Sequence, residues 1–197
     1  MIQVENVVKQ YGKKTVLDHI SFEVGKGEVL GLLGKNGAGK STTMNIITGN
    51  LTATEGTARI DGYDIMENPL EAKKNLGFLP ELPPLYPEMT VKNYLQFVYR
   101  LKKAEQPRDQ HIKEICEQTG IQEVSDRVIR HLSKGYCQRL GIAQALIGNP
   151  EVLILDEPMV GLDPKQIVEI RGLIGQLKKN AYHDSFFTYS DRGAVRV

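Results

Sequence analysis

The sequence has little net charge, few cysteines and no long apolar run, and each shortage excludes a class of protein. Its 197 residues carry 25 Lys and Arg against 24 Asp and Glu, a net charge of +1. Because the lysines are also dispersed, there is no broad basic surface for nucleic acid, and we expect no nucleic-acid partner. The two cysteines, Cys116 and Cys137, lack metal-like spacing and indicate a reduced compartment.

Membrane-spanning and secretory patterns are lacking as well. The longest apolar runs, such as residues 152–155, fall far below the roughly 20 residues that a spanning helix needs. The start, MIQVENVVKQYGKK, contains no apolar stretch of signal-peptide length. With 41% hydrophobic residues the chain can still bury the core of one large domain. We therefore expect a cytosolic globular protein.

The first half of the chain reads as short strands around one helix. Residues 1–30 alternate apolar and polar residues between glycines, which is typical of a small β-region. Residues 29–33 form a continuous apolar run, the pattern of a strand covered on both faces. A glycine-rich loop and a helix follow, with Gly49 as the expected stop. Residues 57–80 return to short strands around the turn pair Asp61 and Gly62.

The hydrophobic period changes to a helical one at Thr90, the expected N-cap. The apolar face of this helix is Val91, Tyr94, Leu95, Val98 and Leu101. Pro107 and Gly120 divide the region into separate helices. A second buried strand at 152–155 and an amphipathic helix at 167–179 follow. The sequence predicts an α/β domain over residues 1–180 with a helical insert at about 88–148.

The strongest motif is GKNGAGKS at residues 34–41, which fits G-x-x-x-x-G-K-[ST] between a strand and a helix. Such a loop turns backbone N–H groups toward phosphate oxygens at a helix N-terminus. Lys40 is expected on the β- and γ-phosphates of ATP and Ser41 on Mg²⁺. The candidate nucleotide-binding residues are Gly34, Asn36, Gly37, Ala38, Gly39, Lys40, Ser41 and Thr42. The alternative is a plain glycine turn.

Two carboxylates, Asp156 and Glu157, stand where the strand VLILD ends. Ligands of open parallel sheets bind at this edge. Asp156 is a candidate Mg²⁺ ligand, and Glu157 is a candidate general base toward the attacking water. An acidic entry into a solvated loop is the alternative interpretation.

These motifs resemble the ATP-binding subunits of ATP-binding cassette (ABC) transporters over residues 1 to about 180. The diagnostic segment is LSKGY at 132–136, followed by Gln138 and Arg139, which resembles the family signature L-S-G-G-Q. The resemblance implies a P-loop NTPase core with a mostly parallel sheet and an N-terminal antiparallel β-region. It also implies that Ser133 and the Gly135 backbone bind the γ-phosphate held by the opposite subunit. Taken alone, Ser-Lys-Gly is an ordinary helix-capping turn.

Further positions follow from the resemblance. Tyr11 falls where the family stacks an aromatic ring on adenine, although plain packing is the alternative. GLD at 161–163 matches the D-loop, which contacts the partner subunit. Residues 79–87 match the loop that couples the Mg²⁺ site to the membrane subunits. The family usually has glutamine where Glu81 stands; Glu81 can still offer oxygen to Mg²⁺ or water, and we take it as a catalytic and metal-binding candidate.

The tail from Asn180 to Val197 does not match the family. There the resemblance implies an apolar strand that ends in a histidine on the γ-phosphate. Permitted codons for residues 181–197, read after omission of one base, encode HTMILSSHILTEVQYV, which does resemble that segment. We hypothesise a single-nucleotide insertion near the codons for Asn180 and Ala181, so that 181–197 is an out-of-frame tail. Thr188 then stands at the histidine position, His183 is not the catalytic histidine, and the central strand is expected to be damaged. A genuine divergent tail is the alternative.

The resemblance implies an ATPase that closes head to tail with a second ATP-binding subunit over MgATP. Closure would drive membrane-embedded permease subunits, which would hold the protein at the inner face of the membrane. The glutamate-containing loop and LSKGY favour export. A non-hydrolysing truncated module and a soluble non-transport ABC ATPase are the alternatives. His19, His111 and His131 lack a ligand-like grouping and are expected in loops or at the surface.

Overall fold

The chain begins with an antiparallel sheet. A computed structural model describes residues 1–32, 34–35, 37–179 and 185–189. The strands of the first sheet, in the order β2-β1-β4-β5, are β1 (Ile2–Tyr11), β2 (Lys14–Val24), β4 (Glu55–Ile60) and β5 (Tyr63–Asp64). Ile2, Val4 and Ile60 point into the core from this sheet. The small β-region predicted from the alternating pattern is confirmed, and so is the antiparallel arrangement that the family resemblance implies.

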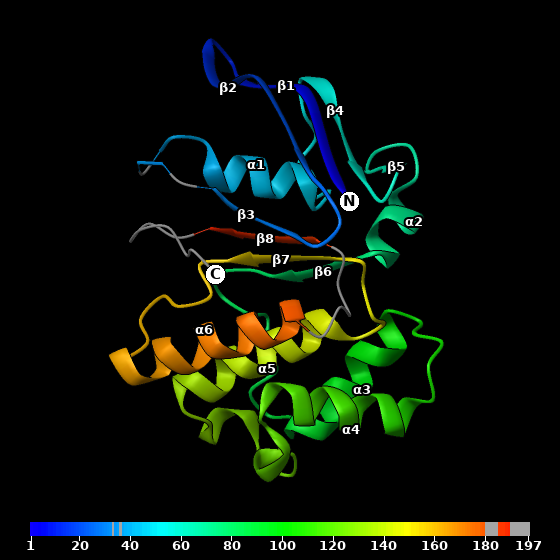
Figure 1. Cartoon of the computed structure of the whole chain (residues 1–197), viewed down its shortest axis with the longest axis vertical. Helices are drawn as coiled ribbons and strands as arrows, with labels where there is room; N and C mark the ends of the chain where they lie inside the picture. The colour runs from blue at the N-terminus through cyan, green and yellow to red at the C-terminus, as the bar shows by residue number, and fades with distance from the viewer. Residues whose placement is uncertain (33, 36, 180–184, 190–197) are drawn as a thin grey trace.

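A parallel sheet forms the centre of the molecule. Its strands, in the order β3-β8-β7-β6, are β3 (Glu28–Leu32), β8 (Ser185–Tyr189), β7 (Val152–Asp156) and β6 (Leu76–Leu79). Figure 1 shows this sheet between α1 on one side and α5 and α6 on the other. Because the strands run parallel, the loops that follow them gather at one edge, where ligands of such sheets bind.

The apolar run of β7 faces a hydrophobic core on each side. Val152 and Ile154 pack with the antiparallel sheet and α1, whereas Leu153 and Leu155 pack with the helices below. All four are fully buried, which explains why the run is continuous rather than alternating. The similar run of β3, one of the two edge strands of this sheet, is only half-buried.

Helix α1 (Lys40–Ile47) follows the glycine-rich loop, and Gly49 ends it with φ +69°. That left-handed conformation suits glycine, so the predicted stop is confirmed. Helix α2 (Pro69–Lys74), which the sequence pattern did not reveal, lies between β5 and β6. It is short and buries only Ala72, and therefore carries no readable apolar period.

The segment between β6 and β7 is helical. It contains α3 (Val91–Leu101), α4 (Arg108–Thr119), α5 (Lys134–Leu146) and the 3₁₀ turns η1 (Gln122–Val124) and η2 (Ile129–His131). Thr90 caps α3, since its Oγ1 accepts from the Asn93 N–H at 3.2 Å, and Gly120 ends α4 with φ +65°. One expectation was wrong: Leu101 is 69% exposed, because it lies at the end of α3, beyond the helices that cover the rest of that face.

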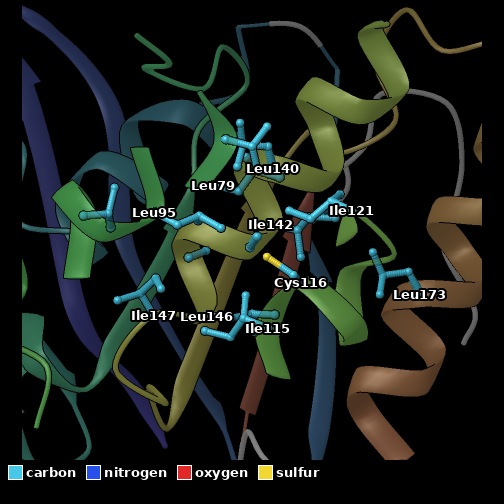
Figure 2. Close-up of a cluster of buried hydrophobic side chains, with 14 of the residues drawn as sticks. Leu79, Leu95, Ile115, Cys116, Ile121, Leu140, Ile142, Leu146, Ile147 and Leu173 are labelled. Atoms are coloured by element: carbon cyan, nitrogen blue, oxygen red, sulfur yellow. The ribbon is translucent and has the colours of Figure 1, made fainter. Parts of the chain in front are cut away.

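Helix α6 (Pro164–Lys179) completes the lower layer. Figure 2 shows the core that these helices share with the sheet, where Leu140 and Ile142 of α5 meet Leu79 of β6. His111 of α4 belongs to this layer and is only 3% exposed, which corrects its expected place in a loop or at the surface. Its Nε2 accepts from the Gly148 N–H at 3.0 Å, so a buried backbone donor is satisfied by a neutral imidazole. Among the described residues no helix has the length and apolarity needed to cross a bilayer.

Candidate functional site

The glycine-rich loop enters α1 through a conformation that requires glycine. Gly39, the N-cap of α1, has φ +91°. A Cβ at this position would lie 2.5 Å from Leu17 Cδ2 and 3.0 Å from the Val16 carbonyl oxygen. Gly37 also has a positive φ of +80°. Backbone N–H groups can therefore turn inward at the helix N-terminus, which is the arrangement that binds phosphate. Asn36 lies outside the described residues.

Lys40 is held against this loop. Its ammonium donates to the carbonyls of Gly34 and Lys35, the latter at 2.8 Å. The side chain is buried, with 7% exposure, so the charge is fixed close to the loop rather than free in solvent. Gly34 and Ala38 form the exposed rim of the same loop, and Ser41 is the first exposed residue of α1 after Lys40.

A cleft of about 500 Å³ gathers residues from separate parts of the sequence. It is lined by Lys14, Val16, Gly37, Gly39, Lys40, Ser41, Thr42, Glu81, Asp156, Glu157 and Val160. The loop at α1, the segment after β6 and the end of β7 thus face a common space. Two lysine cations, hydroxyl groups and three carboxylates meet there, a combination that suits a polyphosphate with a divalent cation.

Asp156 and Glu157 lie where β7 leaves the sheet. Burial raises the pKa of the Asp156 carboxyl above its usual value, and the nearby charge of Glu81 raises it further. Glu157 has φ +49°, in the left-handed region that non-glycine residues rarely adopt. Such a conformation costs on the order of 1 kcal/mol and is concentrated at functional sites.

The donor set of the cleft fits Mg²⁺. Ser41 offers a hydroxyl, while Asp156 and Glu81 offer carboxylate oxygens, and all three line the cleft. Within the described part of the chain, no group of three or more His, Cys, Asp and Glu side chains forms a metal site. Mg²⁺ ordinarily needs no such cage, because it binds through one or two carboxylates, waters and the phosphates of its nucleotide.

Tyr11 does not line the cleft. It is 51% exposed at the end of β1, with the Lys9 ammonium 5.3 Å from its ring centre. It pairs with Lys14 in the β1–β2 ladder, and Lys14 does line the cleft. The sequence reasoning missed Lys14, Val16 and Val160 as lining residues. No local motif marks them, since only the packing of the hairpin against the loop brings Lys14 and Val16 there.

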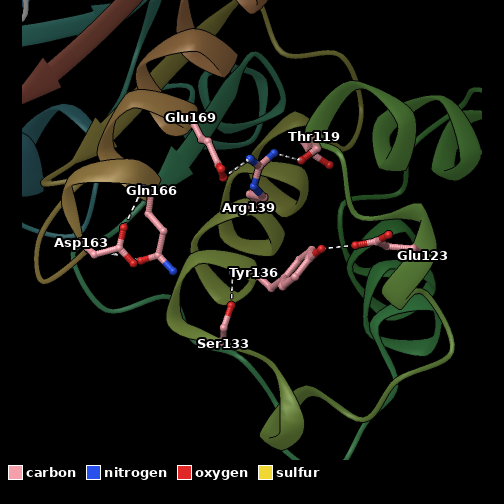
Figure 3. Close-up of polar contacts among 8 residues, drawn as sticks. All are labelled: Thr119, Glu123, Ser133, Tyr136, Arg139, Asp163, Gln166 and Glu169. Carbon is pink, nitrogen blue, oxygen red and sulfur yellow. Dashed lines mark hydrogen bonds and ion pairs between the residues drawn. The ribbon is translucent and has the colours of Figure 1, made fainter.

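Ser133 and Gly135 lie at the start of α5, away from the cleft. Ser133 is the N-cap, and its Oγ accepts from the Tyr136 N–H at 3.3 Å. Gly135 is covered by Gln166 of α6, whose Nε2 would lie 3.0 Å from a Cβ at that position. Figure 3 shows Gln166 paired with Asp163, and Arg139 reaching from α5 toward Glu169 of α6. The start of α5 and the start of α6 therefore pack against one another.

The tail is described only in part. His183 lies outside the described residues. The backbone of residues 185–189 forms β8, which pairs in parallel with both β3 and β7. The expectation of a damaged central strand is corrected to this extent, because ladder hydrogen bonds are made by the backbone whatever the side chains are. Thr188 lies within the strand, opposite Gly31 and Leu155.

Comparison with known proteins identifies the family. The sequence model of the ABC transporter family matches residues 17–160. The chain is 40% identical over 182 residues to the linearmycin resistance ATP-binding protein LnrL of Bacillus subtilis (strain 168). It is 37% identical over 179 residues to the bacitracin transport ATP-binding protein BcrA of Bacillus licheniformis. Each match covers 91% of this chain and 58% of the relative, so the chain spans little more than half of their length.

The fold comparison agrees. The dimeric structure of MJ0796, a bacterial ABC transporter cassette, superposes with a TM-score of 0.82 at 27% identity. The match covers 97% of this chain and 88% of that cassette. The fold, the glycine-rich loop with its facing carboxylates and the sequence match all indicate one protein family. The chain belongs to the ABC transporter family and is an ABC transporter ATP-binding protein.

Proposed function

We propose that the chain binds and hydrolyses MgATP as the nucleotide-binding subunit of an ABC exporter. The observation that carries the proposal is the cleft in which Lys40, Ser41, Glu81, Asp156 and Glu157 line one space. These residues come from the glycine-rich loop, the loop after β6 and the end of β7. Only a ligand with several phosphate oxygens and a divalent cation would use all of them at once.

Each residue then has a defined role. The loop N–H groups and Lys40 hold the β- and γ-phosphates, which places the terminal phosphate beside Glu157. Glu157 accepts a proton from the attacking water as general base. Ser41, Asp156 and Glu81 would hold Mg²⁺, which when bound neutralises charge on the phosphates. Lys40 donates to the carbonyls of Gly34 and Lys35, and it would have to leave these contacts to reach the nucleotide.

The second nucleotide-binding subunit completes the site. ABC ATPases dimerise and pair with membrane subunits, and MJ0796 forms such a dimer. We infer a head-to-tail dimer in which Ser133 and the Gly135 backbone of one subunit contact the γ-phosphate held by the other. The exposed Ser133 hydroxyl at the N-terminus of α5 supports this, because helix N-termini bind anions. Tyr11 on adenine belongs to the same proposal.

A groove with aromatic walls suits a membrane subunit. Its volume is about 340 Å³, and its walls include Pro84, Tyr86, Tyr94, Phe97 and Leu101. Tyr86 meets Phe97 edge to face, with ring centres 5.4 Å apart. Exposed aromatic walls of this kind mark protein interfaces.

Part of the groove wall belongs to the segment that follows Glu81. The Tyr94 hydroxyl contacts Gln144 of α5 and donates to the Pro84 carbonyl at 3.4 Å. Burial raises the pKa of Tyr94, so its hydroxyl stays protonated as a donor. Pro84 stands only a few residues after Glu81. A segment bound in the groove would contact the exposed Tyr86, two residues after Pro84, and would therefore act on the loop that carries Glu81.

The direction of transport is proposed from the relatives. LnrL is named for linearmycin resistance and BcrA for bacitracin transport. We propose export of an antibiotic, with the protein held at the inner face of the membrane by its permease.

The tail is expected to limit turnover. We propose that residues 181–197 are out of frame, so that the chain lacks the histidine that contacts the γ-phosphate. Sequencing the gene tests this directly: codons that do not encode an apolar strand and a histidine after a one-base shift would rule it out. On this hypothesis the chain would bind MgATP and hydrolyse it only slowly.

The functional test compares binding with turnover. The full chain should bind a fluorescent ATP analogue but release phosphate slowly. Replacing residues 181–196 by HTMILSSHILTEVQYV should raise turnover by roughly a hundredfold, on the scale of one lost transition-state contact. In that restored chain, Glu157→Gln should abolish turnover and keep binding, and Lys40→Ala should weaken binding. Lys113→Ala, on the exposed side of α4, is the matched control. Failure of the parent chain to bind ATP would refute the function.

A further inference from the structure

Tyr11, at the end of β1, has a cation against one face of its ring. The Lys9 ammonium lies over the ring, 5.3 Å from its centre. The two residues are two positions apart on the same strand, so their side chains leave the sheet on the same side. A cation within about 6 Å of a ring centre is attracted by the negative face of the π-system. Lys9 therefore covers one face of Tyr11.

The Lys9 ammonium is also anchored to a second segment of the chain. It donates to the Thr52 carbonyl at 2.7 Å, in the stretch that follows α1. Backbone contacts join the same two segments: the Gln10 N–H donates to Thr54 Oγ1 at 3.0 Å, and the Thr54 N–H donates to the Val8 carbonyl at 2.8 Å. Among the described residues no carboxylate forms an ion pair with Lys9. The cation is thus held in place beneath the ring without an anion to compete for it.

The remainder of Tyr11 is free for a ligand. The residue is 51% exposed. Over the described part of the chain its hydroxyl makes no hydrogen bond, and its ring makes no contact with a second ring. A flat, aromatic ligand can therefore stack on the face opposite Lys9.

The β1–β2 hairpin brings this ring to the edge of the nucleotide cleft. Tyr11 pairs with Lys14, and a register shift in the ladder leaves Val16 as an extra residue of β2. Bulges of this kind redirect side chains and are frequent beside active sites. Both Lys14 and Val16 line the cleft, and the Val16 carbonyl would lie 3.0 Å from a Cβ on Gly39 at the start of α1. The strand pairing thus places Tyr11 next to the residues that flank the phosphate loop.

We propose that Lys9 is a positioning residue for nucleotide binding, which holds the Tyr11 ring from one face so that the other face stacks on adenine. This role rests on the proposed function, in which Tyr11 contacts the base. Two physical effects favour the stack. The ring is restricted before the nucleotide arrives, so less entropy is lost on binding. The cation also draws π-electron density toward itself, which reduces repulsion between the ring and an electron-rich base.

The test compares ligands with and without the base, on the full chain. Isothermal titration calorimetry gives the Kd of MgATP and that of magnesium tripolyphosphate, which has the phosphates but no adenine. Lys9→Met should raise the Kd of MgATP by roughly threefold to fivefold, the scale of an exposed cation–π contact, and leave the Kd of tripolyphosphate unchanged. Lys9→Gln, which keeps a donor toward Thr52 but no charge, should behave like Lys9→Met. Lys9→Arg should stay within about twofold of the parent chain, because a guanidinium also lies on aromatic faces.

A double-mutant cycle links the effect to the ring. Tyr11→Ala should raise the Kd of MgATP by roughly tenfold, on the scale of one lost base–aromatic stack. In that background Lys9→Met should have no further effect, since its partner is gone. Lys13→Met is the matched control, because it removes the same charge from the exposed turn between β1 and β2 and should change neither Kd.

Tyr11→Trp provides an independent readout. The chain contains no tryptophan, so the fluorescence of this variant reports on position 11 alone. It should respond to MgATP and not to tripolyphosphate, and the response should require a higher MgATP concentration after Lys9→Met.

The outcomes separate this role from the proposed function. An MgATP Kd that Lys9→Met leaves unchanged, an equal loss for tripolyphosphate, or a loss of the same size in the Tyr11→Ala background would each overturn the role of Lys9 while ATP binding stands. An equal loss for both ligands would assign Lys9 to the phosphates or to the fold alone. Failure of the parent chain to bind MgATP would instead overturn the proposed function, and the role of Lys9 with it.

Discussion

Arg139 joins three helices, and its removal should be the most informative perturbation of the lower layer. From α5 its Nη1 donates to the Thr119 carbonyl at the end of α4, at 3.0 Å, and its Nη2 donates to Glu169 of α6, at 2.9 Å (Figure 3). Its side chain is 20% exposed and that of Glu169 42% exposed. The guanidinium thus donates to a carbonyl at the C-terminus of α4, where the helix itself supplies no donor, and it forms an ion pair with Glu169 of α6.

The expected cost follows from these surroundings. A cation on the last carbonyls of a helix contributes up to about 1 kcal/mol, and a half-exposed ion pair up to about 1 kcal/mol. Arg139→Met keeps the aliphatic packing and should lower the free energy of unfolding by about 2 kcal/mol. For a chain of this length that corresponds to a fall of roughly 4–8 °C in Tm. Glu169→Gln should cost only about 0.5 kcal/mol, since the Thr119 contact remains.

Urea denaturation of both single variants and of the double variant tests the reasoning. The double variant should be more stable than the sum of the single losses predicts, by about 0.5 kcal/mol, because both changes remove the same ion pair. Arg139→Lys should fall between wild type and Arg139→Met, as one ammonium cannot reach both acceptors in the same way. If the free energy of unfolding of Arg139→Met lies within about 0.5 kcal/mol of the wild-type value, the Arg139 contacts do not stabilise the packing of α4, α5 and α6.

Two further changes test the loop and the buried histidine. Gly39→Ala should lower the free energy of unfolding by at least about 2 kcal/mol and weaken ATP binding, because of its φ of +91° and the close Leu17 side chain. Gly172→Ala on α6, where an added Cβ would meet no atom within 4 Å, should instead stabilise the protein by up to about 1 kcal/mol. Equal melting temperatures of the two variants would contradict this prediction. Burial lowers the pKa of His111, so as the pH falls the unfolded chain protonates this histidine before the folded chain does. The free energy of unfolding should therefore decrease below about pH 6.5, by at most about 1.4 kcal/mol per pH unit. His111→Gln should flatten this dependence in melts between pH 7.5 and 5.5, and an unchanged slope would refute the assignment.

Much of the fold could be predicted because its signals are local. Thr90 caps α3, Gly49 and Gly120 end their helices, and the run at 152–155 is buried on both faces. Each of these features depends on a window of about ten residues, in which side-chain periodicity and backbone conformation are coupled. Helix α2 escaped prediction because six residues with one buried side chain show no period.

The candidate site divides in the same way. The motifs predicted Lys40, Ser41, Asp156 and Glu157, because each lies in a short stretch of consecutive residues whose types and spacing indicate the chemistry. Lys14 and Val16 belong to no such motif, and they line the cleft only because the β1–β2 hairpin folds beside the loop. The exposure of Leu101 and the burial of His111 were both misjudged, since each depends on elements distant in sequence.

The sequence by itself determined the α/β order, the helix ends, the phosphate loop and the family resemblance. These are properties of neighbouring residues and need no knowledge of what packs against them. The tertiary structure alone decided that β6, the loop after it, α2, α3 and α5 contribute to one aromatic groove. It also decided that lysines from α2 and from the end of α3 line a neighbouring pocket. Residues more than twenty positions apart, such as Lys73 and Lys102, become neighbours only when long-range burial of apolar surface fixes the layers.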